Sequence, residues 1–313
     1  MNLFKISLRP LSLFQTPLRS DTLWGHICWA IRLLKGESEL KNFLAEYKRG
    51  NFPIVVSDVL PDGYLPIPMH PGIIKYFDRT KSEIDPKKLK KAKYIPISIY
   101  EKLEDSFDAF LENLKDYFAN KENIQDTVDS CFVNFDEWHC SINRVTGNVE
   151  RGMLFSKECS YFKESLTPVI YIKSLFDKPY IENIFKFMGE NGYGADASVG
   201  RGRFDFDILD ATLPTPKQPN SFITLSHGFE RVSEFKSCFY DVDIKFGKIG
   251  NNIGSNPFKK PIANFKPGSL FILKDTDQIK VAYGSIKENA HKSIDFVHEY
   301  SLLFPFYVRW QNE

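Results

Sequence analysis

The sequence lacks the cysteine pairs that mark disulfide frameworks and zinc sites. Its five cysteines are an odd number, and no Cys-x-x-Cys pair occurs among them. The densest group of possible metal ligands is Cys131, His139 and Cys140, which does not have the two-pair spacing of a zinc site. We therefore expect reduced thiols in a cytoplasmic protein that holds no metal.

Long apolar runs are also missing. No stretch approaches 18 uninterrupted apolar residues, which predicts that no segment spans a membrane and that no membrane partner exists. Residues 3–10 alternate apolar and polar side chains, a pattern typical of a strand and unlike the apolar block of a signal peptide.

The chain has almost no net charge, because 41 Lys and Arg stand against 40 Asp and Glu. This balance excludes a histone-like basic binder, but nucleic-acid binding needs only a local positive surface. Charge is indeed polarised locally: residues 75–93 are rich in Lys and Arg, whereas residues 101–130 are acidic. A basic run of this kind is more often a solvated loop than a binding site.

Hydrophobic periodicity predicts an α+β fold. We expect helices over 20–35, 37–49, 101–118 and 178–188, and strands over 3–10, 54–56, 131–142, 153–162, 168–174 and 203–208. The first helix should bury Leu23, Ile27, Ala30, Ile31 and Leu34 against a sheet. The order strand, helix, strand, strand, helix, strand is the ferredoxin-like pattern, with an insertion of about 37–130 after the first helix.

Three prolines in Leu213–Pro219 mark a linker between two domains, residues 1–213 and 220–313. The second domain is rich in strand residues and turns, with little helical periodicity. Fold class alone does not decide function.

The most informative stretch is the glycine-rich loop of residues 192–203, GYGADASVGRGR. Its glycines permit close approach of a ligand to the backbone, successive N–H groups can hold an anion, and its arginines suit phosphate. The loop follows a predicted helix and precedes a strand, which rules out a dinucleotide fingerprint, and no Gly-Lys-Ser/Thr follows for a Walker loop. We therefore expect no cofactor. From the loop alone, an ordinary turn and a phosphate site are equally good interpretations.

Four segments together resemble one family. The glycine-rich loop is similar to the signature loop of the RAMP superfamily of CRISPR-associated RNA-binding proteins. Three further segments are similar to the fourth-subunit family of the Csm complex, the type III-A CRISPR effector: SDTLWGHICWA at 20–30, SINRVTG at 141–147 with GMLF at 152–155, and KKPI at 259–262 with PGSLF at 267–271. The insertion 37–130 carries no matching motif.

The resemblance implies two ferredoxin-like (RRM-like) RAMP domains, the second degenerate. It implies a non-catalytic scaffold that holds the 5′ repeat-derived tag of the CRISPR RNA. It also implies that the scaffold bridges the large polymerase-like subunit to the first backbone RAMP subunit. Asp196 departs from the family pattern by placing a negative charge near the expected phosphate.

On this resemblance the RNA contacts are expected in the loop, at the start of the first helix, where a helix N-terminus attracts phosphate, and in the central motif. Trp24, Trp29 or Tyr193 could stack on bases, although a tryptophan is more often core. The expected RNA-binding residues are Arg19, Ser20, His26, Arg144, Gly194, Ser198, Gly200, Arg201, Gly202 and Arg203.

Two alternatives remain open at this point. A metal-independent endoribonuclease of the same superfamily would need a general acid/base, for which His26 is the candidate, but no second group is placed beside it by the sequence. A pure assembly subunit would contact only proteins, using the irregular region 50–96 and the acidic helix 101–118.

Overall fold

The computed structural model describes residues 1–79, 92–119, 131–250, 256–276 and 279–311. Most of the basic run 75–93 lies outside the described residues, as does the end of the acidic stretch 101–130. Among the described helices, none is long and apolar enough to cross a membrane.

An antiparallel main sheet forms the centre of the first half. Its order is β2-β8-β1-β9, and β3 also pairs with β8. These strands are β1 (Asn2–Pro10), β2 (Ile54–Val56), β3 (Leu60–Pro61), β8 (Pro168–Ser174) and β9 (Phe204–Asp210). The alternation expected in 3–10 is confirmed, since Phe4, Ile6 and Leu8 are buried while their neighbours are not.

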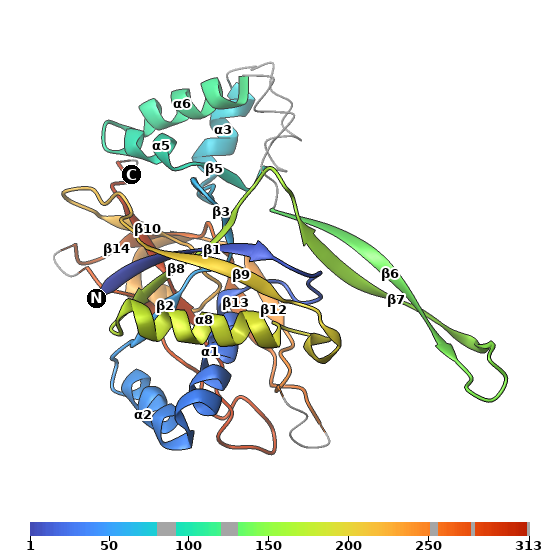
Figure 1. Cartoon of the computed structure of the whole chain (residues 1–313). Coiled ribbons are helices and arrows are strands. Elements are labelled where there is room, and N and C mark those ends of the chain that lie inside the picture. The colour runs from blue at the N-terminus through green and yellow to red at the C-terminus, as the bar shows by residue number, and fades with distance from the viewer. Residues whose placement is uncertain (80–91, 120–130, 251–255, 277–278, 312–313) are drawn as a thin grey trace.

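Two helices cover one face of this sheet (Figure 1). They are α1 (Ser20–Lys35) and α8 (Lys178–Asn191), and α2 (Glu37–Lys48) follows α1. The predicted stripe of α1 is confirmed for Leu23, Ile27, Ala30 and Ile31, but Leu34 is exposed because it lies in the last turn. Trp24 is a core residue that donates to the hydroxyl of Tyr47 at 3.0 Å, so it is not a base-stacking platform.

A small helical group lies beyond the opposite side of the main sheet (Figure 1). It contains β4 (Tyr64–Pro66), α3 (Pro71–Arg79), β5 (Tyr94–Pro96), α5 (Ile97–Tyr100), a 3₁₀ turn over Glu101–Leu103, and α6 (Phe107–Ala119). The predicted helix 101–118 therefore begins later than expected. Its predicted apolar face is nevertheless buried, through Leu103, Phe107, Phe110, Leu111, Leu114 and Phe118.

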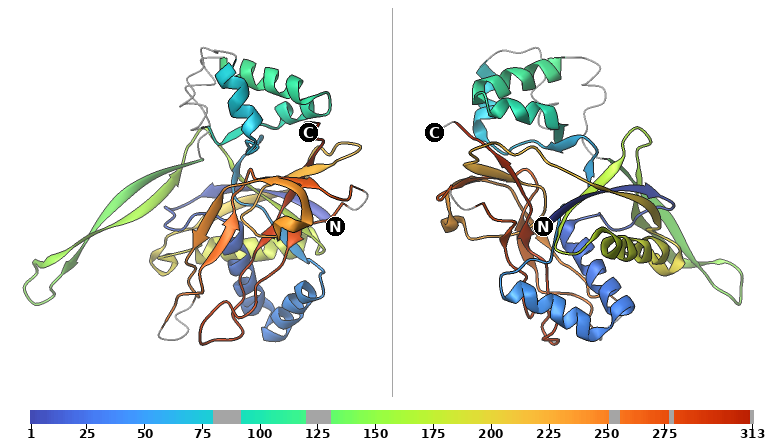
Figure 2. Two further views of the ribbon diagram at one scale, coloured as in Figure 1. Left: turned by 180° about the vertical axis from the view of Figure 1, so that it is seen from behind. Right: turned by 60° about the vertical axis from the view of Figure 1, so that its left-hand side comes forward.

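The strands β6 (Phe132–Ile142) and β7 (Val149–Phe162) form a hairpin of their own. The hairpin projects from the body in each view (Figures 1 and 2). The strands predicted over 131–142 and 153–162 are present, but they do not join the main sheet. The main sheet instead takes β2 and β3, which lie inside the predicted insertion 37–130.

The second half is strand-rich, as expected. Its largest sheet has the antiparallel order β11-β14-β10-β17, and two-stranded sheets pair β12 with β13 and β15 with β16. The strands are β10 (Ser221–Thr224), β11 (Phe235–Phe239), β12 (Val242–Lys245), β13 (Ile262–Phe265), β14 (Leu270–Leu273), β15 (Tyr283–Gly284), β16 (Leu302–Leu303) and β17 (Pro305–Val308), with a 3₁₀ turn at Val232–Glu234.

The two halves share one buried apolar cluster. It contains Ile172 of the main sheet and Leu302 of β16, and a second, smaller cluster surrounds Phe222. The buried Tyr300 hydroxyl accepts from the backbone N–H of Val56 at 3.0 Å. The linker at 213–219 thus separates two stretches of chain that pack against each other.

Candidate nucleic-acid interface

The glycine-rich loop connects α8 to β9 and contains a 3₁₀ turn over Ala197–Val199. It packs against residues 12–16, which precede α1. Gly202 has φ 67°, and a Cβ there would lie 2.0 Å from the carbonyl oxygen of Tyr193. That position therefore requires glycine for close backbone packing.

The backbone N–H groups of the loop are largely engaged inside the protein. Gly194 N–H donates to Nε2 of His26 at 3.1 Å, Gly202 N–H to the carbonyl of Leu13 at 2.8 Å, and Arg203 N–H to Oγ of Ser12 at 2.8 Å. The N–H groups of Gly200 and Arg201 bond within the loop's own turn. These five N–H groups are therefore satisfied within the protein. The expectation that successive N–H groups of the loop hold an anion stays a prediction for Asp196, Ala197 and Ser198, whose N–H groups make no such bond in the described part of the chain.

Two ion pairs join the loop to the middle of the hairpin, where Glu137 lies opposite Lys157. Arg201 contacts both carboxylate oxygens of Glu137 on β6, at 2.5 and 2.7 Å. Asp196 pairs with Lys157 on β7. The hydrogen bond from Lys157 is the main cause that lowers the pKa of Asp196. The negative charge of Asp196 is thus compensated, while Arg203 and Ser198 stay exposed.

His26 on α1 contacts the glycine-rich loop at Gly194. Its ring lies 4.6 Å from that of the buried Tyr193, whose hydroxyl donates to the carbonyl of Pro17 at 2.8 Å. Nε2 accepts the Gly194 N–H, so the proton of the neutral ring is on Nδ1. Burial lowers the pKa of His26 to about 4. Tyr193 is therefore internal and offers no stacking face. His26 is half-buried, and its Nε2 lone pair is taken by the Gly194 N–H.

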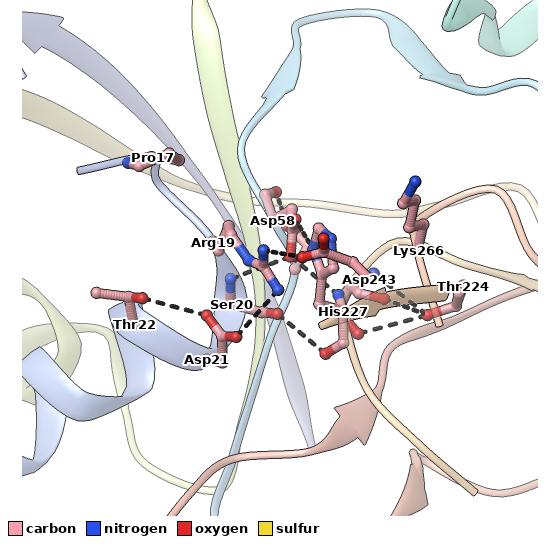
Figure 3. A network of polar contacts seen from close by, with 12 residues as sticks. Pro17, Arg19, Ser20, Asp21, Thr22, Asp58, Thr224, His227, Asp243 and Lys266 are labelled. Carbon is pink, nitrogen blue, oxygen red and sulfur yellow. Dashed lines mark hydrogen bonds and ion pairs between the residues drawn. The ribbon is translucent and has the colours of Figure 1, made fainter. Parts of the chain in front are cut away.

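The start of α1 is occupied by carboxylates of the same chain (Figure 3). Asp58 accepts from the N–H of Ser20 and the N–H of His227, each at 3.0 Å, and its second oxygen lies 2.5 Å from Nδ1 of His227. Burial alone would raise the pKa of Asp58, but His227, Arg19 and the Ser20 N–H outweigh it and lower the pKa to about 2.

Arg19 is enclosed in the same network. Its guanidinium lies 3.3 Å from Asp21 and also pairs with Asp243 of β12, and Lys245 reaches Asp21 at 2.7 Å. The expected phosphate at this helix end is replaced by Asp58, because a buried carboxylate already accepts from the orphan N–H of Ser20. Arg19 and Ser20 therefore join the two halves of the chain, with Ser20 buried and Arg19 half-buried.

Arg144 lies at the exposed tip of the hairpin. Oδ1 of Asn143 accepts from the N–H groups of Val145 at 2.9 Å and Thr146 at 3.2 Å, which closes the turn. Arg144 and Arg203 thus lie on separate parts of the molecule, at the tip of the hairpin and in the glycine-rich loop.

Sequence reasoning missed Glu137, Lys157, Asp58 and His227. Their partners are 38 to 169 residues away, so no local pattern links them. The alternation of residues 132–140 is the one signal that could have grouped Glu137 with His139 on one face of a strand. Within the described residues, no group of His, Cys, Asp or Glu could hold a metal ion.

No protein-family model matches the chain. The chain is 25% identical to the CRISPR system protein Csm4 of Thermococcus onnurineus (strain NA1), over 71% of this chain and 73% of the relative. The fold matches a chain of a Csm3–Csm4 subcomplex from a type III-A CRISPR–Cas interference complex, with TM-score 0.62 and 17% identity over the full length of both. The chain is Csm4-like.

A Csm1–Csm4 cassette in complex with pppApA supplies a second match to this Csm4-like fold. The TM-score is 0.60 and the identity 17%, again over all of both chains. A chain of a type III-B Cmr-beta complex bound to target RNA matches with TM-score 0.50 over 86% of each chain. The mixed α/β architecture with several antiparallel sheets is therefore similar to that of Csm4 structures.

Proposed function

We propose that this chain is a non-catalytic RNA-binding scaffold subunit of a Csm-type effector complex. It holds the 5′ repeat-derived tag of the CRISPR RNA and bridges the large polymerase-like subunit to a backbone RAMP subunit. The observation that carries this proposal is the pair of solved complexes that share the fold, one joining Csm4 to Csm1 and one joining Csm4 to Csm3.

The architecture supports the same proposal. The elements follow the chain order β1, α1, β2, β8, α8, β9, and the four strands lie in one antiparallel sheet. This order fits a ferredoxin-like RAMP domain, which we place at residues 1–213. The strand-rich residues 220–313 form the second, degenerate domain.

In this proposal the RNA backbone runs along the exposed side of the glycine-rich loop. Arg203 and the hydroxyl of Ser198 are exposed there, and Arg201 adds a guanidinium that is already oriented by Glu137. Gly194, Gly200 and Gly202 give the loop its shape. Arg144 contributes a second contact from the tip of the hairpin. His26, Arg19 and Ser20 hold this surface from the inside.

The non-catalytic part of the proposal is supported by the state of His26. A general base must present a free lone pair within hydrogen-bond reach of the proton it removes. The Nε2 lone pair of His26 instead accepts the Gly194 N–H.

The test compares Arg203→Ala and the Arg201→Ala/Arg203→Ala double variant with the unmodified chain. Each is titrated with single-stranded RNA that carries the tag, over a series of salt concentrations. We expect weaker binding, and a slope of log K against log salt that falls by about 0.7 for each phosphate that the variant no longer neutralises. Arg309→Ala is the matched control, because Arg309 is an exposed arginine near the C-terminus. An unchanged salt slope in the double variant would show that the loop does not hold RNA.

A further inference from the structure

The hairpin of β6 and β7 has two chemically different faces. Directly opposed residues share a face, because side chains alternate along each strand and pair across strands. We define the inner face by Phe135, Glu137, His139, Phe155, Lys157 and Cys159, and the outer face by Asn134, Asp136, Trp138, Cys140, Leu154, Ser156, Glu158 and Ser160. The inner face carries the two ion pairs to the glycine-rich loop.

The outer face exposes large apolar side chains. Trp138 is 67% exposed and Leu154 is 63% exposed, and Cys140, which is paired with Leu154, is also exposed. Ile142 continues the apolar surface toward the turn. Contiguous exposed apolar surface on a projecting element marks an interaction site, and tryptophan is the residue type that most often anchors one.

The charges of the outer face decide between RNA and protein as its partner. Asp136 and Glu158 lie directly opposite each other, and like charges in that position destabilise a hairpin by themselves. Among the residues that define this face there is no Lys, Arg or His. The two carboxylates repel phosphate, whereas a partner that brings Lys or Arg relieves their mutual repulsion.

We propose that the outer face docks a protein subunit of the effector complex. The partner surface has an apolar socket for Trp138 and Leu154, with basic side chains opposite Asp136 and Glu158. The hairpin thus separates two kinds of partner, with RNA on the loop side and protein on the outer face. This inference rests on the proposed function, since it requires that the chain assembles with protein subunits.

The test uses two double variants of the full chain, Trp138→Ala/Leu154→Ser and Asp136→Asn/Glu158→Gln. Binding is measured separately to the Csm1-type subunit, to the Csm3-type subunit and to tag-bearing RNA, and self-association is measured by light scattering. Phe296→Ala is the control, because Phe296 is equally exposed, at 67%, in the second half of the chain.

We expect the apolar variant to bind one of the two subunits on the order of tenfold more weakly, as for a tryptophan anchor, with RNA affinity unchanged. The charge variant should bind that subunit with a reduced salt dependence. The inference would be overturned if the apolar variant kept its subunit binding but lost RNA affinity or self-association. It would also be overturned if no assay changed. If the unmodified chain bound neither subunit, the proposed function would fail as well.

Discussion

Residues at the start of α1 contact carboxylates from distant parts of the same chain. The sequence predicts that the start of α1 attracts phosphate. In the fold the Ser20 N–H donates to Asp58 and Arg19 pairs with Asp243, which lie 38 and 224 residues further along the chain. A helix N-terminus predicts that an anion will be present, and only the folded chain shows that the anion is its own carboxylate. The sequence also indicated His26 as an RNA contact, and in the fold its Nε2 accepts the N–H of Gly194 in the glycine-rich loop, which is 168 residues away.

The first prediction concerns His26 and pH. Its pKa is lowered by burial to about 4, against 6.5 in an unfolded chain. As the pH falls, the unfolded chain therefore binds a proton at His26 before the folded chain does. The contribution of neutral His26 to the free energy of unfolding is complete above pH 6.5 and is lost as the pH falls toward 4. By pH 5 the loss amounts to about 2 kcal/mol.

The measurement is urea unfolding at pH 7 and pH 5. His26→Gln keeps an acceptor for the Gly194 N–H but does not titrate, so the variant should lose about 2 kcal/mol less than the unmodified chain between these pH values. If both proteins lose the same stability, the burial of a neutral His26 is wrong.

At the scale of elements, the hairpin and the glycine-rich loop act as one unit. The sequence predicted the strands 131–142 and 153–162 and the loop at 192–203, because alternation and glycine content are local signals. It could not predict that these two strands form a sheet of their own, because pairing is decided by contacts such as those of Glu137 with Arg201 and of Ile54–Val56 with β8. Short strands such as β2 and β3 give almost no periodic signal.

The second prediction tests this coupling. Glu137→Gln and Asp196→Asn each remove one ion pair between loop and hairpin, and the double variant removes both. We expect faster amide hydrogen exchange around Glu137 in the hairpin and in the loop, with exchange in β1 and β8 unchanged, because the opening is local. The exposed Glu112→Gln on α6 serves as the control. Exchange that stays the same in the double variant would contradict the coupling.

For the whole molecule, near-zero net charge fits a chain that offers different surfaces to different partners. Two ion-pair systems organise it: one joins the two halves through Arg19, Asp58 and His227, and the other joins the loop to the hairpin. The expected strand-rich second half is present, and it shares a core with the first. That shared core could not be read from the proline-rich linker, because linker composition reports chain flexibility and not packing between domains.

The central claim is that this chain is an RNA-holding scaffold between protein subunits. The most direct test is to purify the affinity-tagged full chain from its native cell, identify the bound proteins by mass spectrometry and sequence the bound small RNA. We predict Csm1-type and Csm3-type subunits together with CRISPR RNAs that share one repeat-derived 5′ end. Recovery of the chain without those subunits, or with subunits but without such RNA, would contradict the claim.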